Sequence, residues 1–287
     1  MTALPPLPQI IIEPMVRRAL EEDFGVGGDL TSNLLVPASA RAKLYFKARS
    51  SGVISGMEAA RLTFELVDHE VVFTVHKGDG SPVRKGTVIA TIEGPVRSML
   101  MAERVALNFL GRMSGIATLT AKYVKAVQPH NVRIAATRKT TPGLRALEKR
   151  AVLNGGGHTH RGSLSDAIMV KDNHVALAGG IENAVKAIMA GADHMTKVSI
   201  EVDTVAQFKK ILKHRPDVIL LDNMSLDDLR TCVALNAKAR GSKVTLEASG
   251  GVNLRTVTDI AATGVDVISI GALTHSVMNF DIGLDAG

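Results

Sequence analysis

The second half of the chain alternates between short β-branched apolar runs and stretches with a helical period. We expect strands within 132–138, 167–172, 194–202, 217–222, 243–249 and 265–271. Helix candidates between these runs cover 182–191, 204–215, 226–240 and 254–264. The polar residues that end the runs lie 21 to 32 residues apart, which is one strand–helix unit each. Because such strands pair in parallel, the pattern fits a barrel or an open α/β sheet, and with six strands we expect an incomplete α/β barrel of about six strands.

The first part of the chain has a different pattern. A helix candidate over 12–23 precedes a turn-rich segment over 25–33. Apolar and polar residues then alternate over 43–56 and 70–95, with KGDGS and RKG as turn signals, before a second helix candidate over 101–115. These features predict an antiparallel sheet with hairpins. We therefore expect an N-terminal α+β sandwich domain over 1–112 and a barrel domain over 113–274, with the tail 275–287 packed on the first domain.

Composition narrows the class of protein. The chain has 287 residues, 46% of them hydrophobic and 22% charged, which is ordinary for a soluble globular protein. Its single cysteine, Cys232, rules out an intramolecular disulfide and is consistent with a reducing cytoplasm. No run of about 20 apolar residues and no signal-peptide pattern is present, so we expect a cytoplasmic protein without a membrane span.

The net charge of +6 comes from basic residues that are scattered rather than grouped in blocks. The chain has no Trp and only two Tyr, which gives little support for stacking on single-stranded nucleic acid. Arginines and lysines that bind a small anionic substrate explain the same excess. The charge alone therefore favours a small anion over a nucleic acid.

Polar residues end all six predicted strands, where the active site of a parallel α/β barrel forms. The first two strand–helix units supply the cations Arg138, Lys139, Arg161 and Lys171. The next two supply Glu201 and Asp222, and Glu247 lies near the end of the fifth predicted strand. Arginine binds carboxylates through a bidentate fork, whereas paired acids suit ribose hydroxyls or Mg²⁺. Loops are often polar without any function, but six polar strand ends together favour a site.

Glycine-containing turns follow the last two predicted strands, at Ser249-Gly250-Gly251 and at Gly271-Ala272. Glycine lets backbone N–H groups approach an anion, and barrel phosphate sites often lie at this corner. Glycine pairs also occur in ordinary turns, so this signal is weak by itself.

The segment 155–161, GGGHTHR, contains His158 and His160 beside Arg161. Two histidines in this spacing raise the alternative of a metal site. No third ligand stands at a recognisable zinc spacing, however, and the neighbouring residues are cationic. An anion-binding loop is the better interpretation.

Motifs at these residues resemble the quinolinate phosphoribosyltransferase family from end to end. The matching segments are GDLTSN (28–33), AERVALNFLGRMSGIAT (102–118), TRKTTPGLRALEK (137–149), GGGHTHR (155–161), KDNH (171–174), EVD (201–203), LLDNMS (220–225), EASGGV (247–252) and DVISIGALTHS (266–276). The resemblance implies an N-terminal α/β sandwich and a C-terminal α/β barrel. It also implies Mg²⁺-dependent transfer from phosphoribosyl pyrophosphate to quinolinate with loss of CO₂, on the way to NAD.

The resemblance further implies a role for individual residues. Quinolinate would be held by Thr137, Arg138, Lys139, His160, Arg161 and Lys171, and by Arg104 from the neighbouring subunit of a homodimer. Glu201 and Asp222 would face the ribose hydroxyls and Mg²⁺, and with Lys139 and Lys171 would form the catalytic set. The 5′-phosphate would be bound by Ser249, Gly250, Gly251, Gly271 and Ala272.

A few positions depart from the family's usual pattern and leave the shape of the pocket open. They are Arg150, Thr159, Gly162, Ser163 and Ser199. None of them is among the residues assigned above.

Two alternatives use the same residues. A Schiff-base aldolase or decarboxylase could use Lys139 or Lys171, although each lysine has cationic neighbours and no apparent hydrophobic cage. A non-catalytic paralogue could keep the fold and bind an anion. For the enzyme, we expect discrimination against nicotinate, because one carboxylate would leave buried arginines unpaired.

Overall fold

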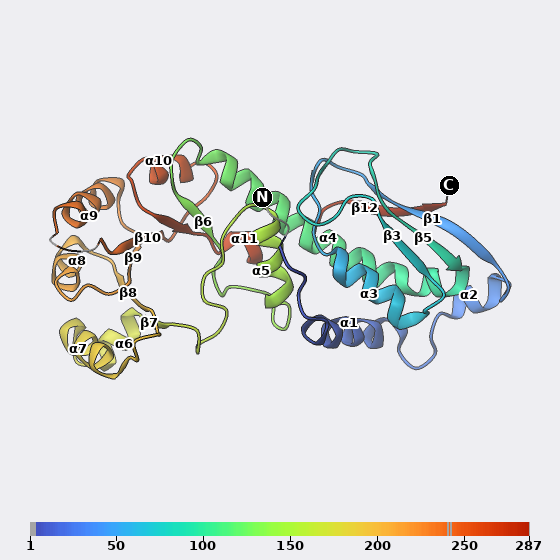
Figure 1. The fold of residues 1–287 in the computed structure, drawn as a ribbon, viewed down its shortest axis with the longest axis horizontal. Helices are drawn as coiled ribbons and strands as arrows, with labels where there is room; N and C mark the ends of the chain where they lie inside the picture. Colours follow the sequence, from blue (N-terminus) through green and yellow to red (C-terminus); the bar gives the residue numbers. More distant parts are fainter. Residues whose placement is uncertain (1–3, 240, 242, 287) are drawn as a thin grey trace. The chain divides into compact units, whose positions relative to one another are not determined.

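The computed structural model describes residues 4–239, 241 and 243–286 (Figure 1). The first residues of the predicted N-terminal domain, Arg240 of the helix candidate over 226–240 and Gly287 of the tail lie outside the described residues. The chain forms two compact units. The first comprises Met1–Ala121, Thr140–Gly156 and Thr274–Gly287, and the second Lys122–Lys139 and Gly157–Leu273.

This division differs from the expected boundary between 112 and 113. The first unit takes in 113–121 and also 140–156, which the strand–helix pattern predicts to lie in the barrel. The reason for the second difference is local packing, because α5 (Arg145–Asn154) buries Leu147, Ala151 and Val152 and its Asn154 Nδ2 donates to Ser55 Oγ at 2.8 Å. Strand–helix periodicity along the chain carries no information about such contacts.

An antiparallel sheet in the order β12-β1-β5-β3 forms the centre of the first unit. Its strands are β1 (Arg41–Ala48), β3 (Val72–Val75), β5 (Val88–Pro95) and, from the tail, β12 (Ile282–Ala286), which pairs with β1. A short pair, β2 (Gly52–Val53) and β4 (Pro82–Val83), lies apart from it. The helices are α1 (Gln9–Phe24), α2 (Leu30–Leu35), α3 (Met57–Val67) and α4 (Val96–Ala126), whose last residues belong to the second unit.

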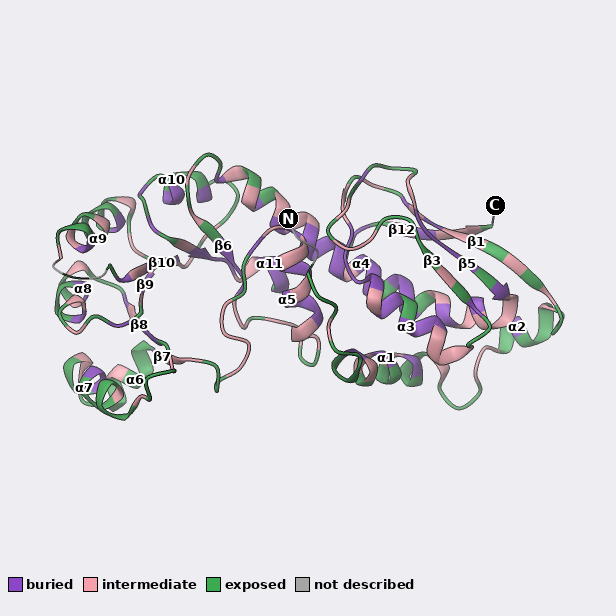
Figure 2. Ribbon diagram, in the orientation of Figure 1, coloured by how far each residue is buried: buried purple, intermediate pink, exposed green. Residues whose placement is uncertain are grey.

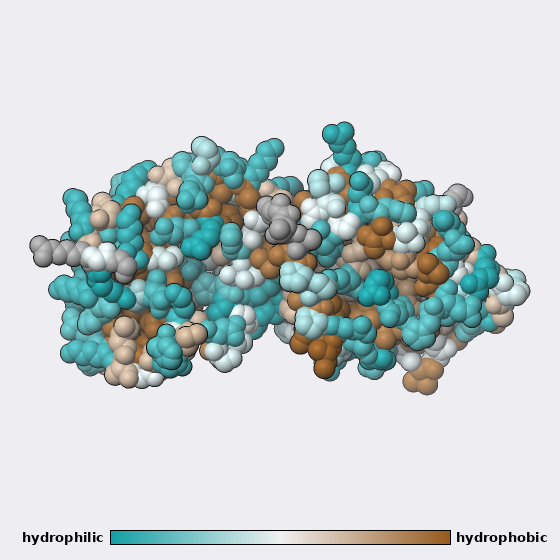
Figure 3. All heavy atoms as spheres, in the orientation of Figure 1, coloured by the Kyte–Doolittle hydropathy of each residue, from teal (hydrophilic) through white to brown (hydrophobic). Residues whose placement is uncertain are grey.

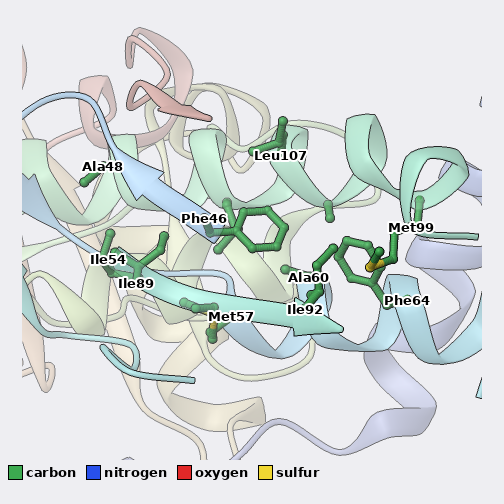
Figure 4. Close-up of a cluster of buried hydrophobic side chains, with 14 of the residues drawn as sticks. Phe46, Ala48, Ile54, Met57, Ala60, Phe64, Ile89, Ile92, Met99 and Leu107 are labelled. Carbon is green, nitrogen blue, oxygen red and sulfur yellow. The ribbon is translucent and has the colours of Figure 1, made fainter. Parts of the chain in front are cut away.

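Apolar side chains of this sheet pack against α3 and α4. The rings of Phe46 and Phe64 lie 5.9 Å apart between centroids, in an edge-to-face arrangement, and Phe73 contacts both. Figure 4 shows Phe46, Ile92 and Met99 in this cluster, and Figure 2 shows buried residues along α3 and α4. Aromatic pairs of this geometry add to the hydrophobic contribution of burial, so the cluster holds the sheet to its helices.

The second unit contains a six-stranded parallel sheet in the order β6-β11-β10-β9-β8-β7. The strands are β6 (Arg133–Ala135), β7 (Ile168–Val170), β8 (Val198–Val202), β9 (Val218–Asp222), β10 (Thr245–Ser249) and β11 (Val267–Ser269). All six predicted parallel strands are therefore confirmed. The helices that follow them are α6 (Asp172–Leu177), α7 (Ile181–Gly191), α8 (Val205–Leu212), α9 (Leu226–Lys238), α10 (Val257–Ala261) and α11 (Ala272–His275), which runs into the first unit.

The two faces of this sheet differ in polarity, because side chains alternate along each strand. One face carries Ile200, Ile219 and Leu246, which are aligned by the strand register and buried. Figure 1 shows α7 to α10 along one side of the sheet, and Figure 3 shows mainly hydrophilic side chains around these outer helices. The alternate positions include Glu201 and Glu247, both in register with Leu220. The polar face of the sheet is thus where the candidate site residues lie.

Candidate active site

Every proposed site residue except Arg104 belongs to the second unit. Lys171 follows β7 directly, Glu201 lies near the end of β8, and Asp222 ends β9. Ser249 ends β10, and Gly271 follows β11 by one residue. The carboxyl ends of parallel strands meet at the same edge of a sheet, so the topology brings these residues to one edge.

Arg138 and Arg161 come together because the segment before Arg161 runs beside β6. His158 forms a parallel bridge with Ala135, with its N–H donating to Ile134 and its carbonyl accepting from Ala136 at 2.8 and 2.9 Å. Burial lowers the pKa of the Arg161 guanidinium and the charge of Arg138 lowers it further, while Asp166 opposes them. Two half-buried guanidinium groups that repel one another are stabilised by a bound anion.

Arg161 is held by the loop that follows it. One Nη of Arg161 donates to the carbonyl of Ala167 at 2.9 Å. The Asp166 carboxylate accepts from the N–H groups of Gly162 and Ser163 at 2.7 and 3.1 Å, and from the Ser163 hydroxyl at 2.5 Å. The two positions that depart from the family pattern are therefore part of a compact turn closed by Asp166.

Lys171 connects the cationic residues to the acidic ones. Its Nζ lies 3.3 Å from Oε2 of Glu201, and the two side chains are 50% and 15% exposed. Lys171 is also the N-cap residue of α6, where its backbone N–H donates to Nδ1 of His174 at 3.0 Å. The ion pair leaves Lys171 half accessible to a ligand and keeps Glu201 on the polar face of the sheet.

The turn after β9 is locked to the end of β10 by Asn223. This residue has a φ of 52°, its N–H donates to the Ser249 carbonyl at 2.9 Å, and its Nδ2 donates to Oδ2 of Asp222 at 2.8 Å. Gly250 has a φ of 91°, and a Cβ there would lie 2.1 Å from Oδ1 of Asn223. Only glycine fits this position, so the glycine turn and the Asp222 carboxylate form one rigid corner.

The turn after β11 lies next to this corner, because β10 and β11 are neighbours in the sheet. The N–H of Ile270 donates to the Ala135 carbonyl at 2.9 Å, which ties the turn to the end of β6. Gly271 and Ala272 follow, and α11 begins at Ala272. Both glycine-containing turns of the sequence analysis thus stand at neighbouring strand ends.

A residue that the sequence analysis treated only as a strand-end polar group lies beside His160. Oε2 of Glu247 is 3.4 Å from Nε2 of His160, with side chains 4% and 18% exposed. Both line a cavity of about 320 Å³, most of whose other walls are residues at or near the amino ends of the strands, among them Arg133, Thr245 and Val267. A single buried Glu within an apolar strand is a signal that could have pointed to this pair.

The described residues include no group of three or more His, Cys, Asp or Glu placed to hold a metal ion. Partial burial and the nearby Arg133 lower the pKa of His158. Arg104 lies on α4 in the first unit, with its side chain exposed.

Comparison with known proteins identifies the family. The model of the quinolinate phosphoribosyl transferase N-terminal domain matches residues 29–114, and that of the C-terminal domain matches 116–285. The chain belongs to the quinolinate phosphoribosyltransferase family. Its relatives include a probable nicotinate-nucleotide pyrophosphorylase (carboxylating) of Bacillus subtilis, 42% identical over 92% of this chain and 89% of that protein.

A second quinolinate phosphoribosyltransferase relative, the nicotinate-nucleotide pyrophosphorylase (carboxylating) of Mycobacterium leprae, is 42% identical over 94% of this chain and 95% of its own length. Among solved structures, the nicotinate-nucleotide pyrophosphorylase of Ehrlichia chaffeensis superposes with a TM-score of 0.90 at 37% identity, covering 96% of this chain and 98% of that one. The family resemblance drawn from the motifs is confirmed.

Two departures from the usual quinolinate phosphoribosyltransferase pattern have a place in the structure. Ser199 lies two residues before Glu201 on the same face of β8; it is buried, and its hydroxyl has no hydrogen-bond partner among the described residues. Arg150 donates from Nη to the carbonyl of Pro5, within the first unit. The contact of Arg150 involves no proposed site residue.

No described helix is both long enough and apolar enough to cross a membrane.

Proposed function

We propose that this chain transfers the phosphoribosyl group of phosphoribosyl pyrophosphate to quinolinate with decarboxylation, giving nicotinate mononucleotide, pyrophosphate and CO₂ for NAD biosynthesis. Membership of the family supports an enzyme of this pentosyltransferase type. The observation that carries the proposal is that Arg161 lies within the electrostatic influence of Arg138, while Glu201 and Asp222 lie at or near the carboxyl ends of neighbouring strands of the same sheet. A dicarboxylate matches the two guanidinium groups, and a sugar phosphate matches the rest of the edge.

The cationic residues of the site bind quinolinate in this proposal. Arg138 and Arg161 each offer a planar fork for a carboxylate, and Lys139, Lys171 and His160 add further donors. Thr137 orders the start of the loop, since its Oγ1 accepts from the N–H of Lys139 at 3.1 Å. Nicotinate has one carboxylate and would leave one guanidinium group unpaired, so we expect the site to discriminate against it.

The two acidic residues of the site bind the ribose and a Mg²⁺ ion carried with the pyrophosphate in this proposal. Glu201 and Asp222 lie on neighbouring strands and, by alternation from the register Glu201 to Leu220, point to the same face. Two carboxylates suit a Mg²⁺ ion that keeps water and substrate oxygens as its other ligands. When bound, the ion would neutralise charge on the departing pyrophosphate.

The glycine turns at Ser249-Gly250-Gly251 and Gly271-Ala272 bind the 5′-phosphate in this proposal. The fixed conformation at Gly250 supports this role for the turn after β10, because Asn223 holds the turn and no side chain fits at Gly250. Bare N–H groups can therefore approach phosphate oxygens.

The chemistry follows from this arrangement. The pyridine nitrogen of quinolinate forms a bond to C1 of the ribose, while the bond from C1 to the pyrophosphate oxygen breaks and its electrons leave with pyrophosphate. Glu201 and Asp222 offset positive charge on the sugar ring. The bond from C2 of the pyridinium to its carboxylate then breaks, its electron pair stays at C2, and a proton takes its place. Lys139 and Lys171 orient the ring for both steps.

Several further features belong to the proposal. The bridge from Ala135 to His158 adds a segment beside β6, beyond the edge of the six-stranded sheet, which supports an incomplete barrel.

Exposure of Arg104 on α4 supports a homodimer in which it reaches the neighbour's site. The expected location is the cytoplasm, which the single cysteine supports.

The test is an assay with quinolinate, phosphoribosyl pyrophosphate and Mg²⁺ that follows nicotinate mononucleotide and CO₂ together, with nicotinate as the parallel substrate. Equal amounts of both products from quinolinate are expected. The variant Arg161→Gln should raise KM for quinolinate about 10- to 100-fold, because a charged hydrogen bond contributes about 1.5–3 kcal/mol. Arg230→Gln, on an exposed arginine paired with Asp227, is the matched control. Folded protein that forms no product from quinolinate would refute the proposal.

A further inference from the structure

We infer that Glu247 is a positioning residue that fixes the imidazole of His160 in the quinolinate site. The inference rests on the proposed function only for the role of His160 as a ligand of quinolinate. Glu247 is not itself placed against substrate. It lies in the middle of β10, whereas the proposed phosphate-binding turn begins at the end of that strand with Ser249.

The first observation is burial. Glu247 is 3% exposed, and a buried carboxylate without a partner is costly, so natural proteins rarely keep one in a strand without a reason. Its neighbours along the strand, Leu246 and Ala248, are buried apolar residues that point to the other face of the sheet. The position therefore receives no charged partner from its own strand.

The second observation is the choice of partner. Among the described residues, the one charged or chargeable group within ion-pair distance of Glu247 is His160, with Oε2 3.4 Å from Nε2. The other carboxylate oxygen, Oε1, is buried and has no hydrogen-bond partner in the described part of the chain. The carboxylate is thus directed to one imidazole and is not shared in a wider network.

The third observation is the space around the ring. His160 and Glu247 both line the cavity of about 320 Å³ that extends among the amino ends of the strands. The imidazole therefore faces open space on that side. A carboxylate facing one ring nitrogen favours the tautomer with its N–H at that nitrogen and holds the plane of the ring, as in other carboxylate–histidine pairs. Glu247 supplies this constraint at Nε2.

A double-mutant cycle tests the inference. Glu247→Leu should lower kcat/KM for quinolinate about 10- to 100-fold, the usual cost of losing a residue that orients a ligand. In a His160→Asn background the same change should have almost no further effect, because Glu247 acts through His160. Glu247→Gln keeps an acceptor of similar shape and should recover most of the loss. Thr245→Val, on the same strand and cavity wall, is the matched control and should leave kcat/KM unchanged.

A measurement that needs no turnover separates this inference from the proposed function. Nitrogen NMR of ring-labelled histidine, with the His160 signals identified by their absence in His160→Asn, should show a protonated Nε2 in the native chain. Glu247→Leu should change those signals, and Thr245→Val should not. Unchanged His160 signals in a folded Glu247→Leu variant, or equal losses of kcat/KM in both backgrounds, would overturn the inference. If the His160 signals respond to the variants as expected but the native chain forms no product, the result would instead count against the proposed function.

Discussion

Nζ of Lys171 lies 3.3 Å from Oε2 of Glu201, across the neighbouring strands β7 and β8. The pair joins a residue assigned to quinolinate with one assigned to the ribose. Since Lys171 is half exposed and Glu201 is mostly buried, the lysine can turn to a substrate carboxylate while the acid stays in place.

We therefore predict that Lys171→Met lowers kcat/KM for quinolinate by about 10- to 100-fold, the equivalent of losing one charge-assisted hydrogen bond. Steady-state kinetics measures the change. The matched control is Lys197→Met. Lys197 pairs with Asp217 at 2.8 Å just before β8 begins, away from the carboxyl ends. Full kcat/KM in the Lys171 variant, or an equal loss in the Lys197 variant, would contradict the assigned role.

The corner at Gly250 yields a second prediction. Gly250→Ala brings a Cβ within 2.1 Å of Oδ1 and 2.9 Å of the backbone N of Asn223, at a φ of 91°. We expect it to lower the free energy of unfolding by about 1–3 kcal/mol, the cost of a strained backbone, and to weaken phosphoribosyl pyrophosphate binding.

Gly251→Ala is the control for this change. Gly251 also has a positive φ, of 59°, but a Cβ there meets nothing within 4 Å. Urea unfolding and KM for phosphoribosyl pyrophosphate should change less in this variant. Equal effects at the two positions would mean that backbone conformation, and not the contact with Asn223, sets the requirement for glycine.

Within the first unit, Arg112 and Glu148 form a buried pair. The Arg112 Nη–Glu148 Oε1 distance is 2.9 Å, the carboxylate is fully buried, and Thr141 donates to it from both its N–H and its hydroxyl. Arg112→Met should lower the free energy of unfolding by about 3–5 kcal/mol, because it leaves a buried charge without its partner.

Denaturant unfolding of the full chain measures this loss. Arg61→Met breaks the exposed pair between Arg61 and Glu65 and should cost under about 1 kcal/mol. A similar cost for both variants would show that the Arg112–Glu148 pair stabilises no more than a surface ion pair does.

Cys232 gives a prediction about pH. Burial raises the pKa of its thiol to about 11, and the Asp228 carboxylate adds to the rise. The native thiol therefore stays protonated at pH 8, and we expect it to react with a thiol reagent about 100-fold more slowly than in the unfolded chain. The unfolded chain loses this proton at lower pH than the native one, so between the two pKa values stability falls as pH rises.

Because Cys232 is the single cysteine, the reagent reports on one site. Cys232→Ala should remove that part of the alkaline loss of stability, as measured by urea unfolding at several pH values above 8. Rapid labelling of native protein at pH 8 would contradict the burial of the thiol.

Periodicity along the chain was sufficient to predict the parallel strands, because each is a short apolar run that ends in a polar residue. It was not sufficient for the division into units. The position of 140–156 depends on contacts such as Asn154 with Ser55, which are remote in sequence. The motifs were sufficient to assign Lys171 and Glu201 to a site, but they did not predict the ion pair between the two residues.

The pair of Glu247 and His160 shows the same limit within the site. Both residues were singled out in the sequence, one as a strand-end acid and the other as a ligand of quinolinate. Their approach depends on the bridge between Ala135 and His158, which places the segment 158–161 beside β6. No local pattern encodes such a bridge, because it pairs a strand with an irregular segment.

The pairing of β12 with β1 has a consequence for synthesis on the ribosome. One edge of β1 is covered by a strand that is translated after all of the second unit. The nascent N-terminal sheet therefore presents an open edge while more than half of the chain is still being made, a state that invites pairing with other chains. The first unit can complete its sheet only after β12 has been translated, so chaperone demand during expression should depend on residues 282–286.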